Sequence, residues 1–187
     1  NSLINDMANK SDPTSVLCLG IDPGSKNFAY ASVVCPDIWA KEPLNTLICE
    51  KEGYIRPIAG VSSQELRQFA VRALKRLKGL ADESGARVVL VSIERFQYRP
   101  GGSSKGAENI LLMIGVLADE LEKSQSFFDV KLVTPATWKT WRSRKEENTN
   151  ACERLGTEST VHEQDAMGMA VWRIANMIPE MHEWDWD

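Results

Sequence analysis

The sequence predicts an α/β domain built on a mixed, five-stranded sheet with helices on both faces. Two observations predict this class: short apolar runs rich in β-branched residues, which suit buried strands, and longer stretches in which apolar residues recur at helical spacing. The two kinds of segment alternate after an initial pair of neighbouring strands, which is typical of sheets covered by helices on both sides. A chain of 187 residues is long enough for one such domain and its core.

Five segments are predicted as strands. Val16–Ile21 is an apolar run that ends in an Asp-Pro-Gly turn, and a tight loop joins it to the second strand, Phe28–Cys35. Thr46–Tyr54 fits a third, antiparallel strand. Arg87–Ile93 is apolar at most positions, as a central strand buried on both faces requires. The fifth predicted strand is Phe127–Val133.

Two capping boxes mark helix starts, because a Ser or Thr hydroxyl and a Glu side chain three residues later can satisfy free amide donors of the first turn. Ser62–Glu65 opens a predicted helix across 63–83, and Thr160–Glu163 opens another across Thr160–Ile178. The third long helix is predicted at Ala107–Lys123, where an apolar stripe recurs at helical spacing.

The remaining segments are shorter or polar. Pro135 opens a further helical turn that contains Trp138 and Trp141, whereas Glu146–Gly156 shows no clear helical pattern. We expect residues 1–14 to form a flexible leader, residues 15–180 to form the single domain, and residues 181–187 to form an acidic, frayed tail.

Composition limits the function classes. No apolar run is long enough to cross a bilayer, and four cysteines without C-x-x-C spacing favour free thiols in a reducing compartment over disulfides or zinc. The net charge of −4 argues mildly against a non-specific nucleic-acid binder. Two basic stretches nevertheless stand out. They contain Arg67, Arg72, Lys75, Arg76 and Lys78 in the first, and Lys139, Arg142, Arg144 and Lys145 in the second.

Three carboxylates follow strand ends or lie near a helix start. Asp22 ends the first strand, Glu94 ends the central strand, and Asp165 lies in the first turns of the last helix. Alone, each fits a plain structural role as a turn residue, a solvated strand end or an exposed helix residue. Together they can complete an oxygen-rich pocket suited to Mg²⁺ or Mn²⁺, and two such ions would support in-line attack on a phosphodiester.

The same residues carry a resemblance to a known family. The run from Gly20 to Tyr30 resembles the G-[IL]-D-P-G opening motif of the RuvC Holliday junction resolvases, Ile93-Glu94 resembles their second motif, and His162–Ala166 is similar to their closing H/D-x-x-D-A signature. The resemblance implies an RNase H-like fold, a homodimer, and metal-dependent cleavage of two strands of a four-way DNA junction. It also implies that Asp22, Glu94, His162 and Asp165 are the catalytic and metal-binding positions, with two Mg²⁺ or Mn²⁺ ions per site.

His162 has a plain alternative reading, as a histidine hydrogen-bonded to a neighbour near the helix start. Its position three residues before Asp165 places both side chains on one helical face, where it could bind a metal or move a proton near neutral pH. Glu163 is left out of the site, because its capping-box position supplies a structural purpose.

DNA contacts are expected from basic residues with interleaved aromatics, which suit phosphates and unstacked bases. The loop after Glu94 also carries a base-stacking aromatic in the resembled family, and the choice between its two aromatics stays open. In the segment 137–142, Lys139 is the better match to the family's lysine near the scissile phosphate, with Lys145 second. The alternative for the loop after Glu94 is a surface loop whose aromatics tuck back onto the domain, and the alternative for the basic stretch is a solvated face. The candidate DNA-contacting residues are Lys26, Arg95, Phe96, Tyr98, Arg99, Lys105, Lys139, Arg142 and Lys145.

The helix Ala107–Lys123 has apolar residues around much of its circumference, so we expect surplus apolar surface and a homodimer through this helix. Three rival functions stay open: a nuclease for RNA–DNA hybrids or other branched DNA, a non-catalytic junction-binding protein, and, least favoured because the chain is too short, an actin-like nucleotide-binding protein. The expected location is the cytoplasm of a bacterial or phage-infected cell, or an organellar matrix.

Overall fold

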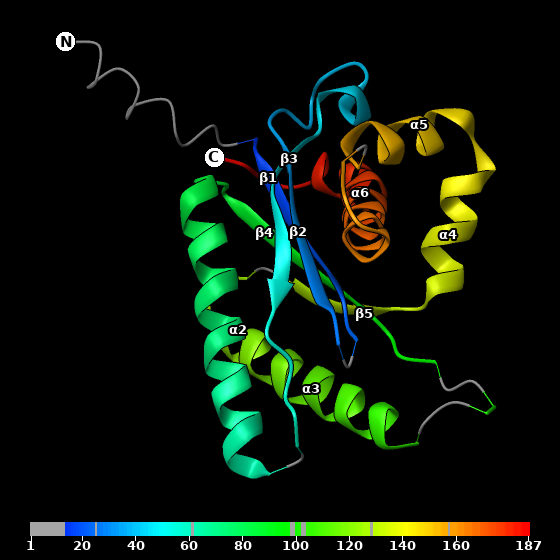
Figure 1. Cartoon of the computed structure of the whole chain (residues 1–187). Coiled ribbons are helices and arrows are strands. Elements are labelled where there is room, and N and C mark those ends of the chain that lie inside the picture. Colours follow the sequence, from blue (N-terminus) through cyan, green and yellow to red (C-terminus); the bar gives the residue numbers. More distant parts are fainter. Residues whose placement is uncertain are drawn as a thin grey trace.

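The computed structural model describes residues 14–24, 26–60, 62–97, 100–101, 104–127, 129–156 and 158–187, with the backbone alone for Ser104 and Lys105. The leader predicted at 1–14 therefore lies outside the described residues except for Thr14. Figure 1 shows a central sheet with helices α2 and α3 on one side and helices α4, α5 and α6 on the other, as the sequence predicted.

The sheet has five strands in the order β3-β2-β1-β4-β5. Their bounds are β1 Val16–Asp22, β2 Phe28–Cys35, β3 Ile48–Ile55, β4 Val88–Glu94 and β5 Asp129–Val133. Strands β1, β2 and β3 pair antiparallel, and β4 and β5 extend the sheet in parallel with β1, so the sheet is mixed. All five strands predicted from the sequence are present, with ends shifted by two residues at most.

Alternation along the central strands divides the core into two layers. Leu17, Leu19 and Ile21 of β1 pack in the layer beneath α2 and α3, whereas Val16 and Cys18 pack in the layer beneath α6. Strands β1 and β2 are buried at every position, and β4 is buried at every position but its last. Continuous apolar strands are what a sheet covered on both faces requires.

The helices cover more of the chain than the sequence indicated. A short 3₁₀ turn, η1, spans Pro43–Thr46, and the α-helices are α2 Ser63–Ser84, α3 Ser104–Lys123, α4 Pro135–Arg144, α5 Glu146–Leu155 and α6 Val161–Met181. The segment 146–156, whose sequence shows no clear helical pattern, is nevertheless largely helical. In α5, Ala151 and Cys152 are buried and pack in the layer beneath α6, and the Asn148 side chain donates to the Trp141 carbonyl at 3.0 Å. Tertiary packing therefore forms this helix despite its polar sequence.

The two helix-start predictions have different outcomes. The capping box at Thr160–Glu163 is confirmed, with both reciprocal contacts present. At the start of α2, the Ser62 hydroxyl accepts from the Glu65 amide at 3.2 Å, but the Glu65 carboxylate accepts from the Gly60 amide at 3.2 Å and the Ser62 hydroxyl at 2.9 Å instead.

The carboxyl-terminal segment is packed rather than frayed, which corrects the expectation for 181–187. Trp184 and Trp186 lie against the α6-side core, and the Trp186 indole donates to the Met181 carbonyl at 2.8 Å. The Arg87 guanidinium lies 5.5 Å from the centre of the Trp186 ring and donates to its carbonyl. The two Trp side chains therefore hold this acidic segment against the domain.

Helix α3 buries most of its apolar residues within its own chain. Ile110, Met113, Ile114, Leu117 and Leu121 all belong to the core beneath α2 and α3. The exposed apolar surface is therefore smaller than the sequence suggested, and its largest exposed side chain is Leu111, at 55%. In the part of the chain that the structure describes, no helix is long and apolar enough to cross a membrane.

Candidate functional site

Two of the three predicted carboxylates lie side by side because their strands are neighbours. β1 and β4 pair in parallel, with Ile21 opposite Ile93, so Asp22 and Glu94 follow at the same end of the sheet. Ile21 and Ile93 belong to the α2-side core, so alternation directs the next residue of each strand to the α6 side. Asp22 is 6% exposed there.

Gly20 determines how closely the third carboxylate approaches. A side-chain carbon at Gly20 would stand 1.9 Å from the carbonyl oxygen of Ala166, so the backbone of α6 rests directly on β1 at this point. Asp165, the residue before Ala166, is thereby brought to the end of the strand that carries Asp22. A glycine is required here because any β-carbon would force the helix away.

Asp22 is paired with His162. The two side chains meet at 3.0 Å between His162 Nδ1 and Asp22 Oδ2. Burial raises the pKa of the Asp22 carboxyl, the hydrogen bond with His162 lowers it, and the nearby charge of Asp165 raises it again. About half of the His162 side chain is exposed, so the imidazole is accessible to solvent while it contacts Asp22.

Glu94 is held by Trp138 of helix α4. The Trp138 indole nitrogen donates to Glu94 Oε2 at 2.9 Å, and the Trp138 side chain is completely buried. The ring packs against α6 at Gly168, where a side-chain carbon would stand 2.6 Å from its Cζ3 atom. Burial raises the pKa of Glu94, the Trp138 hydrogen bond lowers it, and the charges of Asp22 and Asp165 raise it further.

Asp165 faces Lys139, also on α4. The Lys139 ammonium lies 3.3 Å from Asp165 Oδ2 and 5.2 Å from the centre of the Trp138 ring. Arg142, one turn farther along α4, lies 5.3 Å from the same ring. Helix α4 therefore brings one cation, Lys139, and one indole donor, Trp138, to the carboxylates, and Arg142 lies beside the indole ring.

The donor chemistry of this group fits a hard divalent cation. Three carboxylates from β1, β4 and α6 are close enough to act on one another electrostatically, and the pKa values of both Asp22 and Glu94 are raised. Oxygen ligands of this kind are what Mg²⁺ and Mn²⁺ prefer. Among the described residues, however, no three His, Cys, Asp or Glu side chains are placed together as a metal cage. Each carboxylate is instead engaged by His162, Trp138 or Lys139.

The fold is shared with solved structures. RuvC of Thermus thermophilus in complex with a Holliday junction substrate matches with a TM-score of 0.58 and 16% identity, covering 88% of this chain and 96% of that one. A second structure of T. thermophilus RuvC matches with a TM-score of 0.57 and 17% identity, covering 87% and 96%. The chain has the RuvC fold.

Other comparisons add little. The yeast mitochondrial Holliday junction resolvase matches with a TM-score of 0.49 and 12% identity, covering 87% of this chain and 80% of that one. No sequence-family profile matches the chain. No curated protein matches it either.

The remaining predicted DNA-contacting residues come from several separate loops of this RuvC-like fold. Lys26 is exposed in the β1–β2 loop and Lys145 is exposed between α4 and α5, and neither contacts the carboxylates. Arg95 is exposed, while its backbone amide donates to the Val133 carbonyl at 2.7 Å. Phe96 is partly buried against the α2-side core, as its plain structural reading had it.

Three of the candidates fall outside what the structure describes. Tyr98 and Arg99 are not among the described residues, and the side chain of Lys105 is not described. The base-stacking assignment between Phe96 and Tyr98 therefore stays a prediction.

Sequence reasoning missed Trp138, which holds Glu94, and Gly168, which leaves room for the Trp138 ring. Trp138 was noted only as an aromatic within a basic stretch, and Gly168 was not singled out. Their contact with the site depends on α4 packing across α6, and Trp138 is 44 residues from Glu94 in the chain. The available signal was a Trp whose neighbours on α4 are mostly polar, which is unusual unless the ring is buried.

Proposed function

We propose that this chain is a structure-selective DNA endonuclease that cleaves four-way junctions with paired, symmetric nicks. The observation that carries the proposal is the convergence of Asp22, Glu94 and Asp165 at one end of a RuvC-like sheet. The RuvC of T. thermophilus with this fold was solved with a Holliday junction substrate, which supports branched DNA as the substrate class here.

Mg²⁺ or Mn²⁺, at two ions per site, would be held by the three carboxylates, with His162 as a fourth ligand or as the proton carrier. When bound, these ions would lower the pKa of an attacking water and stabilise the charge on the phosphate oxygens. The raised pKa values of Asp22 and Glu94 support a cation at this place, since crowded carboxylates with lost hydration gain most from a positive charge.

The chain's own residues would position the DNA strand. Lys139 stands beside Asp165 and presents an ammonium, so it can hold the scissile phosphate over the carboxylates. Arg142 adds a second cation on the same helix. His162, with a half-exposed imidazole, can take up or release a proton on the solvent side of Asp22.

Paired nicks need two sites, and we place the partner chain on helix α3. Leu111 is exposed on this helix, and a separate groove of about 340 Å³ between α2 and α3 is lined by the apolar side chains Leu66, Val71 and Val116 together with charged residues. A homodimer through this face is tested by sedimentation. The Leu111→Glu variant should be a monomer that nicks one strand without coordinated second cleavage.

The test of the function uses a labelled synthetic four-way junction with Mg²⁺ or with EDTA. We expect symmetric nicking with Mg²⁺, and binding without cleavage in EDTA. Asp22→Asn should bind the junction and fail to cleave it, whereas Asp82→Asn, the same substitution at an exposed position near the end of α2, should cleave normally.

Other outcomes separate the rivals. Faster cleavage of an RNA–DNA hybrid, or of flaps and other branched DNA, than of the junction would assign one of the alternative nucleases. Wild-type cleavage by Asp22→Asn would refute the catalytic site. Tight binding without cleavage under any divalent ion would favour a non-catalytic junction-binding protein.

A further inference from the structure

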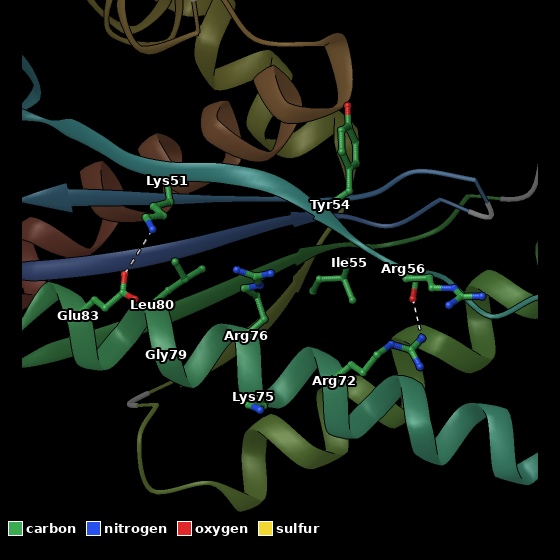
Figure 2. Close-up of a pocket in the computed structure, with 10 residues that line it drawn as sticks. All are labelled: Lys51, Tyr54, Ile55, Arg56, Arg72, Lys75, Arg76, Gly79, Leu80 and Glu83. Atoms are coloured by element: carbon green, nitrogen blue, oxygen red, sulfur yellow. Dashed lines mark hydrogen bonds and ion pairs between the residues drawn. The ribbon is translucent and has the colours of Figure 1, made fainter.

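A second basic surface lies away from the carboxylates, between the edge strand β3 and helix α2. Figure 2 shows this groove, whose volume is about 530 Å³. Five of the residues that line it are basic and one is acidic. They are Lys51 and Arg56 of the β3 segment, Arg72, Lys75 and Arg76 of α2, and the single carboxylate, Glu83.

The positive charge of the groove is largely uncompensated. Its one carboxylate is 3.8 Å from Lys51, at one end. Within the described part of the chain, Arg56, Arg72, Lys75 and Arg76 form no ion pair with any carboxylate, and the Arg72 guanidinium donates instead to the Arg56 carbonyl at 2.9 Å. The chain as a whole has a net charge of −4, so these four cations without ion-pair partners are a local concentration of positive charge. They repel one another unless an anion is bound.

The shape of the groove is elongated and open. Arg72, Lys75, Arg76 and Gly79 recur at helical spacing along one stripe of α2, and a side-chain carbon at Gly79 would meet no atom within 4 Å. The opposite wall runs from Lys51 to Arg56, a rise of about 17 Å along an extended strand. A DNA strand carries one phosphate per 3.4 Å of helix axis, so this length matches about five phosphates.

One end of the groove lies at the same end of the sheet as the carboxylates, although the groove is on the α2 side and the carboxylates are on the α6 side. Tyr54 is paired with Ala29, and Ala29 is paired with Asp22, so the three residues form one row across the sheet. The Tyr54 hydroxyl hydrogen-bonds with Thr160 and donates to Glu163 Oε1 at 3.4 Å, at the start of the helix that carries His162. Figure 2 shows the Tyr54 ring directed away from α2, while Ile55 lies between β3 and α2.

We infer that this groove binds the phosphodiester backbone of a DNA arm that extends away from the cleaved strand. Exposed, flexible cations along an open channel suit a series of backbone phosphates, whereas a site for one small anion is usually enclosed and built with backbone amides. The inference rests on the proposed function, since it takes the DNA bound at the carboxylates to be the same molecule.

The test compares two double variants of the full chain for binding to a labelled four-way junction in EDTA. Lys75→Gln/Arg76→Gln neutralises two groove cations. Lys41→Gln/Lys78→Gln is the control, because it removes two cations from exposed positions that line neither this groove nor the α2–α3 groove proposed for the dimer. Thermal melting of both variants checks that each is folded.

The groove variant should lose about two phosphate contacts. Each contact contributes about 0.9 to the slope of log K against log salt, so the slope should fall by about 1.8 and binding at 0.1 M salt should weaken roughly 60-fold. The control variant should bind within about threefold of the wild type. Equal affinities, or equal losses, in the two folded variants would overturn the inference.

Two further outcomes keep the inference separate from the proposed function. Binding in EDTA does not require hydrolysis, so a wild-type protein that fails to cleave the junction but loses affinity in the groove variant alone supports the groove and refutes the nuclease. Displacement of the junction by micromolar pyrophosphate, to the level of the groove variant, would show a compact anion site and overturn the DNA-arm assignment.

Discussion

Replacing Gly20 with alanine should separate helix α6 from strand β1 and move two catalytic candidates, His162 and Asp165, away from Asp22 and Glu94. The added carbon would stand 1.9 Å from the Ala166 carbonyl oxygen, about 1.1 Å inside the 3.0 Å below which such contacts essentially never occur. The obstacle is backbone, so no side-chain rotation relieves it. Helix α6 must shift by about an ångström, and Asp165 and His162 must shift with it.

The expected stability loss is moderate. Overpacking of this kind costs up to about 3 kcal/mol, and the loss of a flexible glycine from the unfolded chain returns up to about 1 kcal/mol. A net loss of about 2 kcal/mol lowers the melting temperature by roughly 4–8 °C in a domain of this size, so the variant still folds. Gly115→Ala on α3 is the stability control. Its side-chain carbon would meet no atom within 4 Å, and it should raise stability by about 1 kcal/mol.

The effect on cleavage should exceed the effect on stability. A displacement of about 1 Å in a reacting group can cost about 100-fold in rate, so junction cleavage by Gly20→Ala should fall by roughly that factor while junction binding in EDTA is retained. The assay is single-turnover cleavage of the labelled junction at a temperature at which both proteins are folded. Wild-type cleavage and an unchanged melting temperature would refute the claim that β1 and α6 are in direct contact at this point.

Three further predictions follow from the side chains around the site. Trp138→Phe removes the hydrogen bond that lowers the pKa of Glu94, so the acidic limb of the pH–rate profile should move to higher pH. The free energy of unfolding in urea should also fall by about 2–4 kcal/mol. An acidic limb that does not move would make Trp138 purely structural. Glu94→Gln removes a carboxylate whose pKa is raised in the folded state, so the metal-free variant should have a higher melting temperature than the wild type at neutral pH. The difference should disappear as the pH falls below the ordinary carboxyl range, because both proteins are then neutral at this position. Arg173 is buried and pairs with the half-exposed Asp129. Asp129→Asn should therefore lower the free energy of unfolding by about 3 kcal/mol, because it leaves a buried guanidinium unpaired, whereas Arg173→Met should change it by no more than about 1 kcal/mol. The reverse order in urea unfolding would contradict this.

Local sequence patterns predicted the strands and most of the helices, because the burial of apolar runs and the capping of helix ends are marked in short stretches of sequence. The strand that ends at Asp22 is apolar throughout, and the capping box at Thr160 is complete in both the sequence and the structure. Helix α5 was not predicted in this way, because its buried face consists of Asn148, Ala151 and Cys152 and has too few apolar residues to stand out in a polar sequence.

The candidate site was predictable in its charges and not in its supports. Asp22, Glu94 and Asp165 follow from strand ends and a helix start, which the sequence marks. That Trp138 holds Glu94 depends on how α4 crosses α6, a contact between segments far apart in the chain that neither propensity nor spacing encodes. The close approach at Gly20 is of the same kind, because a glycine in a strand does not reveal which backbone lies against it.

The protein donors around the carboxylates have a consequence for how the proposed site would work. His162, Trp138 and Lys139 each occupy a carboxylate oxygen that a divalent ion would also need. Lys139 and His162 are about half exposed and can turn outward, whereas the buried Trp138 cannot. An incoming phosphate would attract Lys139 away from Asp165 and free that carboxylate, so DNA would promote formation of the complete ligand set. In the proposed nuclease, substrate and metal would therefore bind with positive coupling, and cleavage would be suppressed until a strand is seated over the carboxylates.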